Sequence, residues 1–303
     1  MSLSRLRTFI EVYRQRSISA AARVLDLTQP AVSQHIAGLE DAIGHQLFER
    51  GVRGVAPTAV ADELAADIGD KLDGAEAALA AARARSAEIA GAIRIVGHDD
   101  FLAEVAAPHL LALLQAGMRV RLQSGDRDQV QQHLIDGHSD LGISAYTITD
   151  RRLRSERIRS ERLLAVAAPV VAARLLAAPD LAPALAAEPM LAYNLERPLV
   201  DDWLAENDLA TRAIRPALIG QDLRALRSLL CLGFGWSVLP EYLCASHIAR
   251  GELAQIPAPV KTPRNDYFLV WAPSALRHPR IAHARQTLVW RLGERSDGPT
   301  TAR

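Results

Sequence analysis

SISAAARVLDLTQPAVSQHIAGLEDAIGHQLFER, residues 17–50, is the stretch that decides the fold of the N-terminal part of the chain. Ser19 is a suitable N-cap for a short alanine-rich helix, whose small side chains let another helix approach closely. Thr28 can cap a following helix, and Pro30 is tolerated in its first turn because the missing amide would have no helical partner there. Gly44 supplies the stop of that helix. The pattern predicts two short helices joined by a three-residue turn, which is a helix-turn-helix.

Apolar side chains at helical spacing extend this unit on both sides of the turn. They are Leu3, Leu6, Phe9, Ile10 and Tyr13 in a helix expected to end near Arg16, and Val32, Ile36, Leu39 and Ile43 in the helix after the turn. Leu47 and Phe48 can then anchor a two-stranded ribbon that turns around Gly51 and Gly54. The sequence therefore predicts a wing beside the helix-turn-helix.

Residues 59–91 form a second segment, predicted as one long helix from Ala59 to Ile89. Small and apolar residues alternate along it at spacings of four and three, as in a coiled coil. These seam positions include Ala61, Ala65, Ile68, Leu72, Ala75, Leu79 and Ala82. Because so long and exposed a helix is not stable alone, we expect a partner, most simply the same helix of a second copy. The alternative is that the alanines pack on the C-terminal part of the chain.

Beyond Gly91 strands alternate with helices, which predicts an α/β fold with a mostly parallel sheet and crossover helices. The expected strands are residues 93–98, 119–125, 140–144, 162–169, 189–194, 215–220, 235–240 and 267–273. One expected helix begins near residue 100, and a second runs through residue 134. Three more cover 201–207, 221–232 and 279–292. Residues 256–263 are predicted to be an extended linker, after which the chain could return to the first subdomain.

Charge divides the chain at the same places. The 303 residues have a net charge of zero, which gives no indication of a nucleic-acid partner. Residues 1–58 carry a net charge of +2, residues 59–91 carry −4, and residues 92–303 carry +2. The balance points to three parts rather than one domain.

The helix after the turn has a polar outer face. Its residues are Gln29, Ser33 and Gln34, with Ala37 beside them. A glutamine can pair bidentately with adenine in the major groove, and a serine can reach a base or a phosphate. Arg50 and Arg53 on the wing can contact flanking phosphates or the minor groove. The alternative is an ordinary helical domain whose polar face contacts only water.

These residues closely resemble the winged helix-turn-helix of LysR-type transcriptional regulators. The resemblance is carried by AAARVL (20–25), LTQPAVSQHI (27–36), LE (39–40) and LFER (47–50), and more loosely by DLGIS (140–144) and GFGWSVLPEYL (233–243). It covers nearly the whole chain and implies a sequence-specific DNA-binding regulator. By position, the implied DNA contacts are Thr28, Gln29, Pro30, Ser33, Gln34, Arg50 and Arg53. Position 34 is often arginine in the family; glutamine there favours adenine over guanine and removes one charge.

The resemblance also implies the architecture of the remaining chain. The implied parts are a DNA-binding domain (1–58), a dimerisation helix (59–91) and a two-lobed effector-binding domain (92–303) like the periplasmic binding proteins of type 2. Lobe I would comprise about 92–165 and 266–295, and lobe II about 166–265. Family members pair their linker helices into dimers and tetramers, which suits a domain whose charge of +2 should bind DNA only weakly as a monomer.

An effector would lie between the lobes, because ligands of open α/β sheets bind beyond the carboxyl ends of the strands. The side chains expected there are His98, Asp99, Ser124, Ser144, Tyr146, Tyr193, Asn194 and, as an aromatic wall, Phe234. These residues also have alternative roles that involve no effector. Asp99 and Asp100 could be helix N-caps rather than a counter-charge for an amine, His98 could be a satisfied strand-end residue, and the serines could close loop turns.

Two further groups of residues have open roles. The arginines between Arg151 and Arg162 are interleaved with acidic residues, which favours a solvated strand pair over a second DNA-binding patch. Cys231 and Cys244 are the only cysteines. Redox-sensing members of the family use a regulatory disulfide, but Cys231 continues an apolar run, which favours two inert buried thiols.

Several classes of protein are excluded by what the sequence lacks. It has no HExxH, GxSxG, Walker A or full GxGxxG motif and no zinc-ligand spacing, so we expect no enzyme, no metal and no cofactor. It has no apolar run that could span a membrane, and arginines interrupt its N-terminus, so we expect a cytoplasmic protein. The expected partners are double-stranded DNA, an unknown small-molecule effector, further copies of the chain and, as a candidate, RNA polymerase. The alternatives are a thiol redox sensor, a solute-binding protein, or an enzyme on the two-lobed fold.

Overall fold

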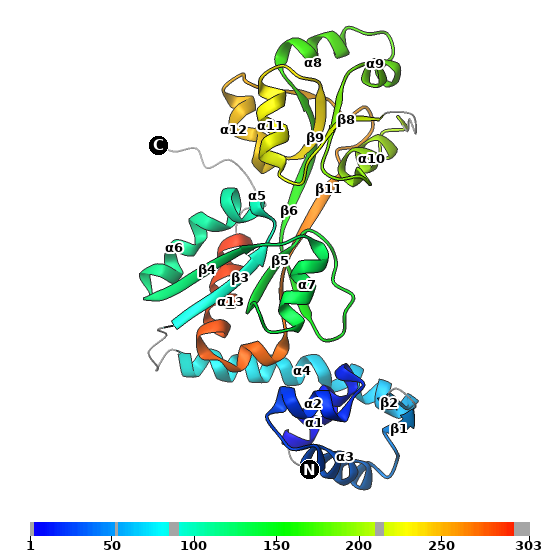
Figure 1. Ribbon diagram of the computed structural model, residues 1–303, viewed down its shortest axis with the longest axis vertical. Helices are drawn as coiled ribbons and strands as arrows, with labels where there is room; N and C mark the ends of the chain where they lie inside the picture. Colours follow the sequence, from blue (N-terminus) through cyan, green and yellow to red (C-terminus); the bar gives the residue numbers. More distant parts are fainter. Residues whose placement is uncertain (1–2, 52–53, 85–90, 210–214, 294–303) are drawn as a thin grey trace.

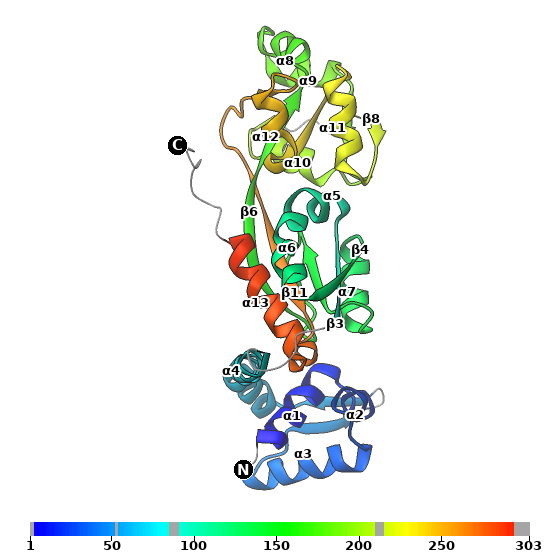
Figure 2. The same cartoon turned by 90° about the vertical axis from the view of Figure 1, so that its left-hand side faces the viewer.

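The chain forms an elongated molecule whose parts follow one another along its long axis (Figure 1). A computed structural model describes residues 3–51, 54–84, 91–209 and 215–293. The N-terminal helices lie at one end, the long helix α4 (Ala59–Ala84) lies next to them, and two α/β lobes complete the molecule (Figures 1 and 2). Within the described ranges, none of the helices combines the length and the hydropathy that a membrane span requires.

The N-terminal domain is a winged helix-turn-helix. Its elements are α1 (Leu3–Gln15), α2 (Ile18–Leu25), α3 (Gln29–Ile43), β1 (Phe48–Gly51) and β2 (Gly54–Pro57). As expected, the Thr28 hydroxyl caps α3, and Gly44 ends the helix with a φ of 79°. The cap of α2 is Ser17 rather than Ser19, because the Ser17 hydroxyl accepts the amide of Ala20 and the helix begins one residue after it.

One apolar cluster holds this domain together. Its buried members are Phe9, Ile10, Val12, Ala21, Ala22, Val32, Ile36, Leu39, Leu47 and Ala61. The predicted stripe of α3 is therefore confirmed as core, with Ile43 packed at its edge. Since Ala61 belongs to α4, the start of the long helix is part of the same core.

The described part of residues 91–293 forms two lobes that share one nine-stranded sheet. Its strands are β3 (Gly91–Gly97), β4 (Met118–Ser124), β5 (Leu141–Ser144), β6 (Arg154–Ala167), β7 (Met190–Ala192), β8 (Pro216–Ile219), β9 (Trp236–Pro240), β10 (Ala254–Ile256) and β11 (Arg264–Trp271). The strand order is β4-β3-β5-β11-β6-β9-β7-β8, with β10 beside β6.

The lobes are joined by two long antiparallel strands. β3 is parallel to β4 and β5, and β7 is parallel to β8 and β9, as the sequence predicts for each lobe. In contrast, β6 and β11 run antiparallel along their length and pass from one lobe to the other (Figure 1). The chain crosses once in each direction, so these two strands cannot be parallel. β6 begins at Arg154 rather than at residue 162, and its arginine-rich half is a strand pair, as expected.

Lobe I carries the helices that follow β3, β4 and β11. They are α5 (Asp99–Phe101), the π-helical turn η1 (Leu102–Ala106), α6 (Ala107–Gln115), α7 (Arg127–Ile135), the 3-10 turn η2 (Pro273–Arg277) and α13 (Pro279–Gly293). Buried side chains such as Ile95 of β3, Leu141 of β5 and Leu288 of α13 share one core. Helix α13, the last described element, therefore returns to lobe I, as the sequence predicts.

Lobe II contains five helices among the described residues. They are α8 (Pro169–Leu176), α9 (Leu181–Ala187), α10 (Pro198–Ala205), α11 (Leu223–Cys231) and α12 (Glu241–Ala249). The sheet is covered on both faces, by a cluster around Trp203 and Trp236 and by a second around Leu226 and Leu239. Helices α8, α9 and α12 are not among the helices expected from the sequence.

Candidate functional site

Helix α3 presents a polar face to solvent at the end of the molecule farthest from lobe II (Figures 1 and 2). Its exposed residues are Gln29, Pro30, Ser33, Gln34 and Ala37, with Thr28 exposed at the cap. Its opposite face is buried in the domain core. The side chains predicted to contact bases therefore share one accessible face of a packed helix, the shape that the major groove admits.

The wing is attached to α3 by one carboxylate. Glu40 Oε1 accepts the amide of Leu47 at 2.8 Å and the amide of Phe48 at 3.3 Å. These bonds fix the start of β1 against α3, the recognition helix of the helix-turn-helix. The main chain of Arg50 lies in β1, and Arg53 lies outside the described residues.

The second strand of the wing is held by Arg16, the residue that follows α1. The amide of Val55 donates to the carbonyl of Arg16 at 3.0 Å. Gly54 has a φ of 134°, and a Cβ there would lie 2.4 Å from the same carbonyl oxygen. Glycine is therefore required at this contact, because any side chain would push the wing away.

The predicted dimerisation positions of α4 lie in two different environments. Ala61 is fully buried in the helix-turn-helix cluster, where Ala65, Ile68 and Leu72 also pack. Ala75 and Leu79 are exposed, Leu79 by 53%. Ala82 belongs to the last turns of α4, and the predicted helix end at Ile89 lies outside the described residues. Within this chain, Ala75 and Leu79 are free to meet a partner helix, whereas Ala61 is already covered.

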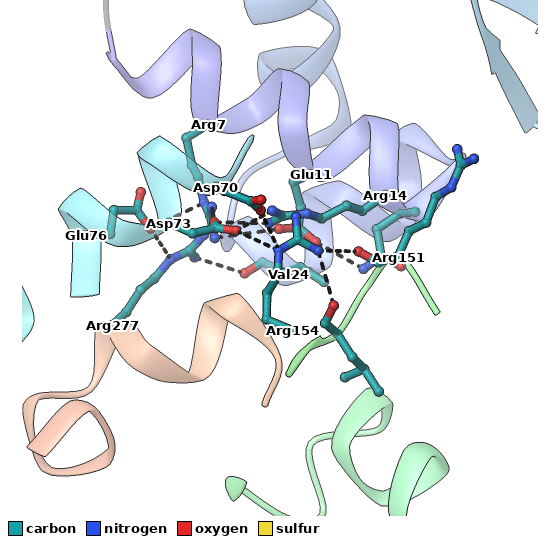
Figure 3. A network of polar contacts seen from close by, with 12 residues as sticks. Arg7, Glu11, Arg14, Val24, Asp70, Asp73, Glu76, Arg151, Arg154 and Arg277 are labelled. Atoms are coloured by element: carbon teal, nitrogen blue, oxygen red, sulfur yellow. Dashed lines mark hydrogen bonds and ion pairs between the residues drawn. The ribbon is translucent and has the colours of Figure 1, made fainter. Parts of the chain in front are cut away.

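A network of ion pairs joins α1, α4 and lobe I (Figure 3). Asp73 of α4 accepts hydrogen bonds from Arg7 Nη1 at 2.7 Å and from Arg14, both in α1. Arg154 Nε, at the start of β6, lies 3.5 Å from the same carboxylate. The side chains of Arg7, Arg14 and Asp73 are only 7%, 3% and 11% exposed. Three arginines thus share one buried carboxylate at the junction.

Lobe I reaches the helix-turn-helix through a second arginine contact (Figure 3). Arg277 of η2 donates to the carbonyl of Val24 in α2 at 3.4 Å and lies 3.9 Å from Glu76 of α4. Neither contact has a local signal in the sequence, because the partners are distant in the chain and Arg277 alone resembles a surface charge.

A cleft between the lobes contains three spaces. Two open pockets have volumes of about 770 and 590 Å³, and a small cavity of about 30 Å³ lies at the centre. Tyr146 lines all three spaces, and Tyr193 lines the larger pocket and the central cavity. The two outer pockets have the size of small-molecule sites, whereas the centre has room for little more than one water molecule.

Hydrogen bonds between the lobes close the centre of the cleft. His98 Nδ1, at the end of β3, lies 3.3 Å from the hydroxyl of Tyr193 in lobe II. The hydroxyl of Tyr242, in the first turn of α12, donates to the buried carboxylate of Asp100 at 2.6 Å. Burial raises the pKa of Tyr193 and of Tyr242, so both hydroxyls remain protonated near neutral pH.

His98 combines burial with an unused hydrogen-bonding atom. Burial lowers the pKa of His98 below its ordinary value of 6.5, although Asp100, Asp126 and Asp99 favour the charged form. Its Nε2 is buried and has no hydrogen-bond partner within the described part of the chain. A ligand in the central cavity could satisfy this nitrogen, since an unpaired buried polar atom is costly.

An ion pair also bridges the lobes. Arg227 of α11 lies 3.2 Å from Glu104 of η1 and donates to the carbonyl of Leu243. The pair joins lobe II to lobe I beside the cleft and adds to the two tyrosine contacts.

Other predicted effector residues lie at the cleft or beside it. Ser124 donates to Asp99 at the neighbouring ends of β4 and β3, where both are exposed. Asn194 lines the larger pocket and accepts the amide of Arg197 at 3.0 Å. Neither Asp99 nor Asp100 is the N-cap of α5, because both lie within its first turn and His98 occupies the cap position.

Two predicted effector residues do not face the cleft. Ser144 is fully buried, and its hydroxyl donates to the carbonyl of Tyr146 and accepts its amide, so Ser144 shapes the loop that carries Tyr146. Phe234 is 45% exposed and precedes β9, whose opposite end at Pro240 lines the central cavity. Phe234 therefore lies at the other end of the strand and lines none of the three spaces.

Several lining residues were missed by the sequence analysis. Leu199, Leu223, Asn265 and Tyr267 line the central cavity, and Tyr242 contacts two of its lining residues, Asp100 and Tyr267. Tyr242 follows the end of β9, so the strand-end rule could have found it. Tyr267 lies in β11, and no local pattern shows that this strand crosses the cleft.

Both cysteines are free thiols. Cys244 is buried, its Sγ lies 3.3 Å from the carbonyl oxygen of Pro240, and burial raises its pKa to about 12. Cys231 is half-buried rather than buried, and burial also raises its pKa. Neither thiol has the lowered pKa of a reactive cysteine.

A helix-turn-helix with an exposed recognition helix, joined by a long helix to two lobes around a cleft, is the architecture of a DNA-binding regulator with a ligand-binding domain. Residues 3–62 match the family model of the bacterial regulatory helix-turn-helix proteins of the lysR family. Residues 86–292 match the LysR substrate binding domain. The chain belongs to the LysR family of transcriptional regulators.

Similar proteins cover almost the whole chain. It is 34% identical to the HTH-type transcriptional regulator AbaB of Streptomyces antibioticus, over 95% of this chain and 97% of that protein. It is 30% identical to the HTH-type transcriptional regulator TrpI of Pseudomonas aeruginosa, over 95% of this chain and 96% of that protein. The structure of CrgA, a LysR-type regulator from Neisseria meningitidis, has the same fold, with a TM-score of 0.61, 23% identity and coverage of 97% and 100%.

Proposed function

We propose that this regulator binds its operator through α3 and the wing of two or more copies, and that a small molecule bound between the lobes changes how those copies are arranged. The observation that carries the proposal is the exposed polar face of α3, which lies opposite a fully packed apolar stripe. Such a helix can enter a major groove without disturbing the core that holds it.

The DNA contacts divide into base contacts and phosphate contacts. Gln29, Ser33 and Gln34 are the candidates for base edges, with Gln34 favouring adenine. Thr28 and Pro30 lie at the N-terminus of α3, where a phosphate is stabilised by free amides and the helix dipole. Arg50 and Arg53 of the wing would contact phosphates or the minor groove, and these contacts fix position rather than sequence.

The effector site consists of the central cavity and the larger outer pocket. His98, Tyr146, Tyr193 and Asn194 supply hydrogen-bonding groups, with Asp99, Ser124 and the buried Asp100 nearby. The larger pocket is lined by Asp126, Asp128 and Glu196 against one cation, Arg127. This excess of carboxylates favours an effector that donates hydrogen bonds or carries positive charge over a polyanion.

The Asp73 network is the proposed link between the two sites. Arg154 belongs to β6, which runs through both lobes, while Arg7 and Arg14 belong to the DNA-binding domain. A change in the angle between the lobes would move the start of β6 relative to α4. An effector can drive that change only if it binds the two arrangements with different affinities.

Self-association would use the part of α4 that its own chain leaves exposed, around Ala75 and Leu79, and the predicted seam continues to Ala82. Pairing of two such helices would place two recognition helices on one duplex, which compensates for the weak charge of a single domain. The regulator would act in the cytoplasm, where its DNA target lies.

The DNA part of the proposal is tested by fluorescence anisotropy on the region upstream of the protein's own coding sequence, with competitor DNA and at several salt concentrations. We expect binding about 10³-fold or more tighter than to a scrambled sequence of equal length. Equal affinity for both sequences, and for fragments selected from genomic DNA, would refute it.

The effector part is tested by thermal unfolding of the full chain with a panel of small amines, neutral polar compounds and dicarboxylates. We expect stabilisation by members of the first two groups, and loss of that stabilisation in Asp100→Asn. Stabilisation by dicarboxylates alone would overturn the proposed charge preference. An equal effect in Asp100→Asn would remove this carboxylate from the site.

A further inference from the structure

A group of metal-ligating side chains lies in lobe II, apart from the cleft and the DNA-binding surface. Cys231 ends α11, His247 lies in the last turn of α12, and Glu252 lies in the turn that follows α12. One potential ligand atom of each lies within 4.8 Å of the other two. In the part of the chain that the structure describes, this is the one group of three or more such side chains close enough to hold a metal ion.

The separations are near those of a tetrahedral site. Cys231 Sγ lies 3.7 Å from His247 Nδ1, and this nitrogen lies 2.6 Å from Glu252 Oε2. Zinc bonds of about 2.3 Å to sulfur and about 2.0 Å to nitrogen, at tetrahedral angles, separate these two ligand atoms by about 3.5 Å. The sulfur and nitrogen therefore need almost no movement. The Glu252 carboxylate, 44% exposed, needs to rotate outward by less than about 1 Å.

The main chain holds the three ligands in a fixed frame. The amides of Glu252 and Leu253 donate to the carbonyl of His247 at 2.9 and 3.3 Å. Gly251 makes this turn possible with a φ of 72°. Helix α11 packs beside α12, so Cys231 is presented from a second rigid element.

The guanidinium group of Arg250 lies beside these three side chains, in the place that another cation would take. Its Nη2 lies 3.1 Å from His247 Nδ1, and its Nε lies 2.9 Å from Glu252 Oε1. The side chain is 52% exposed and can therefore leave for solvent when another cation takes its place. Arg250 is thus a competitor of a metal ion rather than a ligand, since guanidinium has no acceptor atom.

We propose that Cys231, His247 and Glu252 bind one Zn²⁺ ion, with water as the fourth ligand. Sulfur, imidazole nitrogen and carboxylate oxygen together suit zinc and exclude Mg²⁺ and Ca²⁺, which take oxygen ligands. Three protein ligands and an exposed side leave one open coordination position. Helix α11 leads from this site to Leu223 at the cleft and carries Arg227, which bridges to lobe I, so a bound ion would fix the helix that joins the lobes.

The experiment uses the full-length, reduced protein with Co²⁺ as a spectroscopic probe and Zn²⁺ as the competitor. Thiolate ligation of Co²⁺ gives a charge-transfer absorption in the near ultraviolet, which Zn²⁺ removes as it displaces the probe. We expect one Zn²⁺ per chain, no charge-transfer absorption in Cys231→Ser, and a loss of zinc affinity of about tenfold or more in His247→Ala. Cys244→Ser is the matched control, because Cys244 is buried elsewhere, and it should keep the absorption.

Arg250→Gln provides a test in the opposite direction. Removing the competing cation should tighten Zn²⁺ binding, and this variant leaves all three ligands in place. The proposal is overturned if wild type shows no thiolate absorption, if the absorption survives in Cys231→Ser or disappears in Cys244→Ser, or if His247→Ala and Arg250→Gln bind zinc like wild type. Circular dichroism identifies any variant that fails to fold. In that case the absorption spectrum of wild type and the zinc affinity of Arg250→Gln decide whether the proposal holds.

Discussion

Arg277 donates a hydrogen bond of 3.4 Å to the main-chain carbonyl of Val24, across 253 residues of sequence. The first residue lies in the turn before the last helix, and the second lies in the scaffold helix of the helix-turn-helix. The effector-binding domain therefore contacts the DNA-binding domain of its own chain directly, beside the carboxylate of Asp73. The orientation of the recognition helix is set within one chain as well as by any partner.

Asp73→Asn should destabilise the junction. It leaves Arg7 and Arg14 buried without their shared carboxylate, and breaking a buried ion pair costs about 3 to 5 kcal/mol. Asp70→Asn is the matched control, because the Asp70 side chain is 86% exposed and pairs only at the surface, where the cost is about 1 kcal/mol or less. Thermal and urea unfolding of both variants measures the difference. Equal unfolding midpoints for the two variants would show that the Asp73 network contributes no more to stability than the surface pair of Asp70.

Gln34→Ala should weaken binding to the operator by about 1 to 3 kcal/mol, since one bidentate base contact would be lost. Binding to random DNA should change little, because the substitution removes no charge and no phosphate contact. Anisotropy titrations with both DNAs at one salt concentration make the comparison. An equal loss of affinity for both DNAs would show that Gln34 contacts the DNA backbone instead of a base.

Leu79→Asp should reduce self-association without harming the monomer. Leu79 is 53% exposed in its own chain, so a charge there meets water in the monomer but a desolvated seam in a paired helix. Leu72→Asp differs, because Leu72 packs against the helix-turn-helix cluster and its loss should lower thermal stability as well. Sedimentation velocity and thermal unfolding separate the two effects. Unchanged sedimentation of Leu79→Asp would place the dimer contact elsewhere.

His98 should make stability dependent on pH. Its folded pKa is lowered by burial, so the unfolded chain takes up a proton first as the pH falls below 6.5. Stability from this residue is present above that pH and is lost as the pH falls toward the lower folded value, by at most about 1.4 kcal/mol per pH unit. His98→Gln should flatten this slope. Thermal unfolding between pH 4.5 and 7.5, in steps of about half a unit, compares this variant with wild type. Identical slopes for wild type and His98→Gln would contradict the assignment.

The sequence predicts the elements whose signals are local. Thr28, Pro30 and Gly44 delimit the recognition helix through cap chemistry, and its polar and apolar faces follow from periodicity alone. The α/β alternation likewise predicts the strands of each lobe. Ser17 shows the limit of this approach, because Ser17 and Ser19 are both suitable caps by residue type and the structure alone shows that Ser17 caps α2.

The sequence does not predict contacts between distant segments. Tyr242 and Tyr267 reach the cleft because β9 ends there and β11 crosses it, which depends on the order of strands in the sheet. Phe234, expected as an aromatic wall, precedes β9 and therefore lies at the end of this strand opposite Pro240, which lines the cleft. The arginines around Asp73 resemble surface charges until the fold brings three elements together.

Glu40 binds the first two amides of the wing with one oxygen. These bonds couple the wing to α3, so the angular phase between the proposed major-groove contact and the proposed wing contact would be constant for each subunit. Any adjustment to different promoters must then come from the spacing between subunits or from curvature of the duplex.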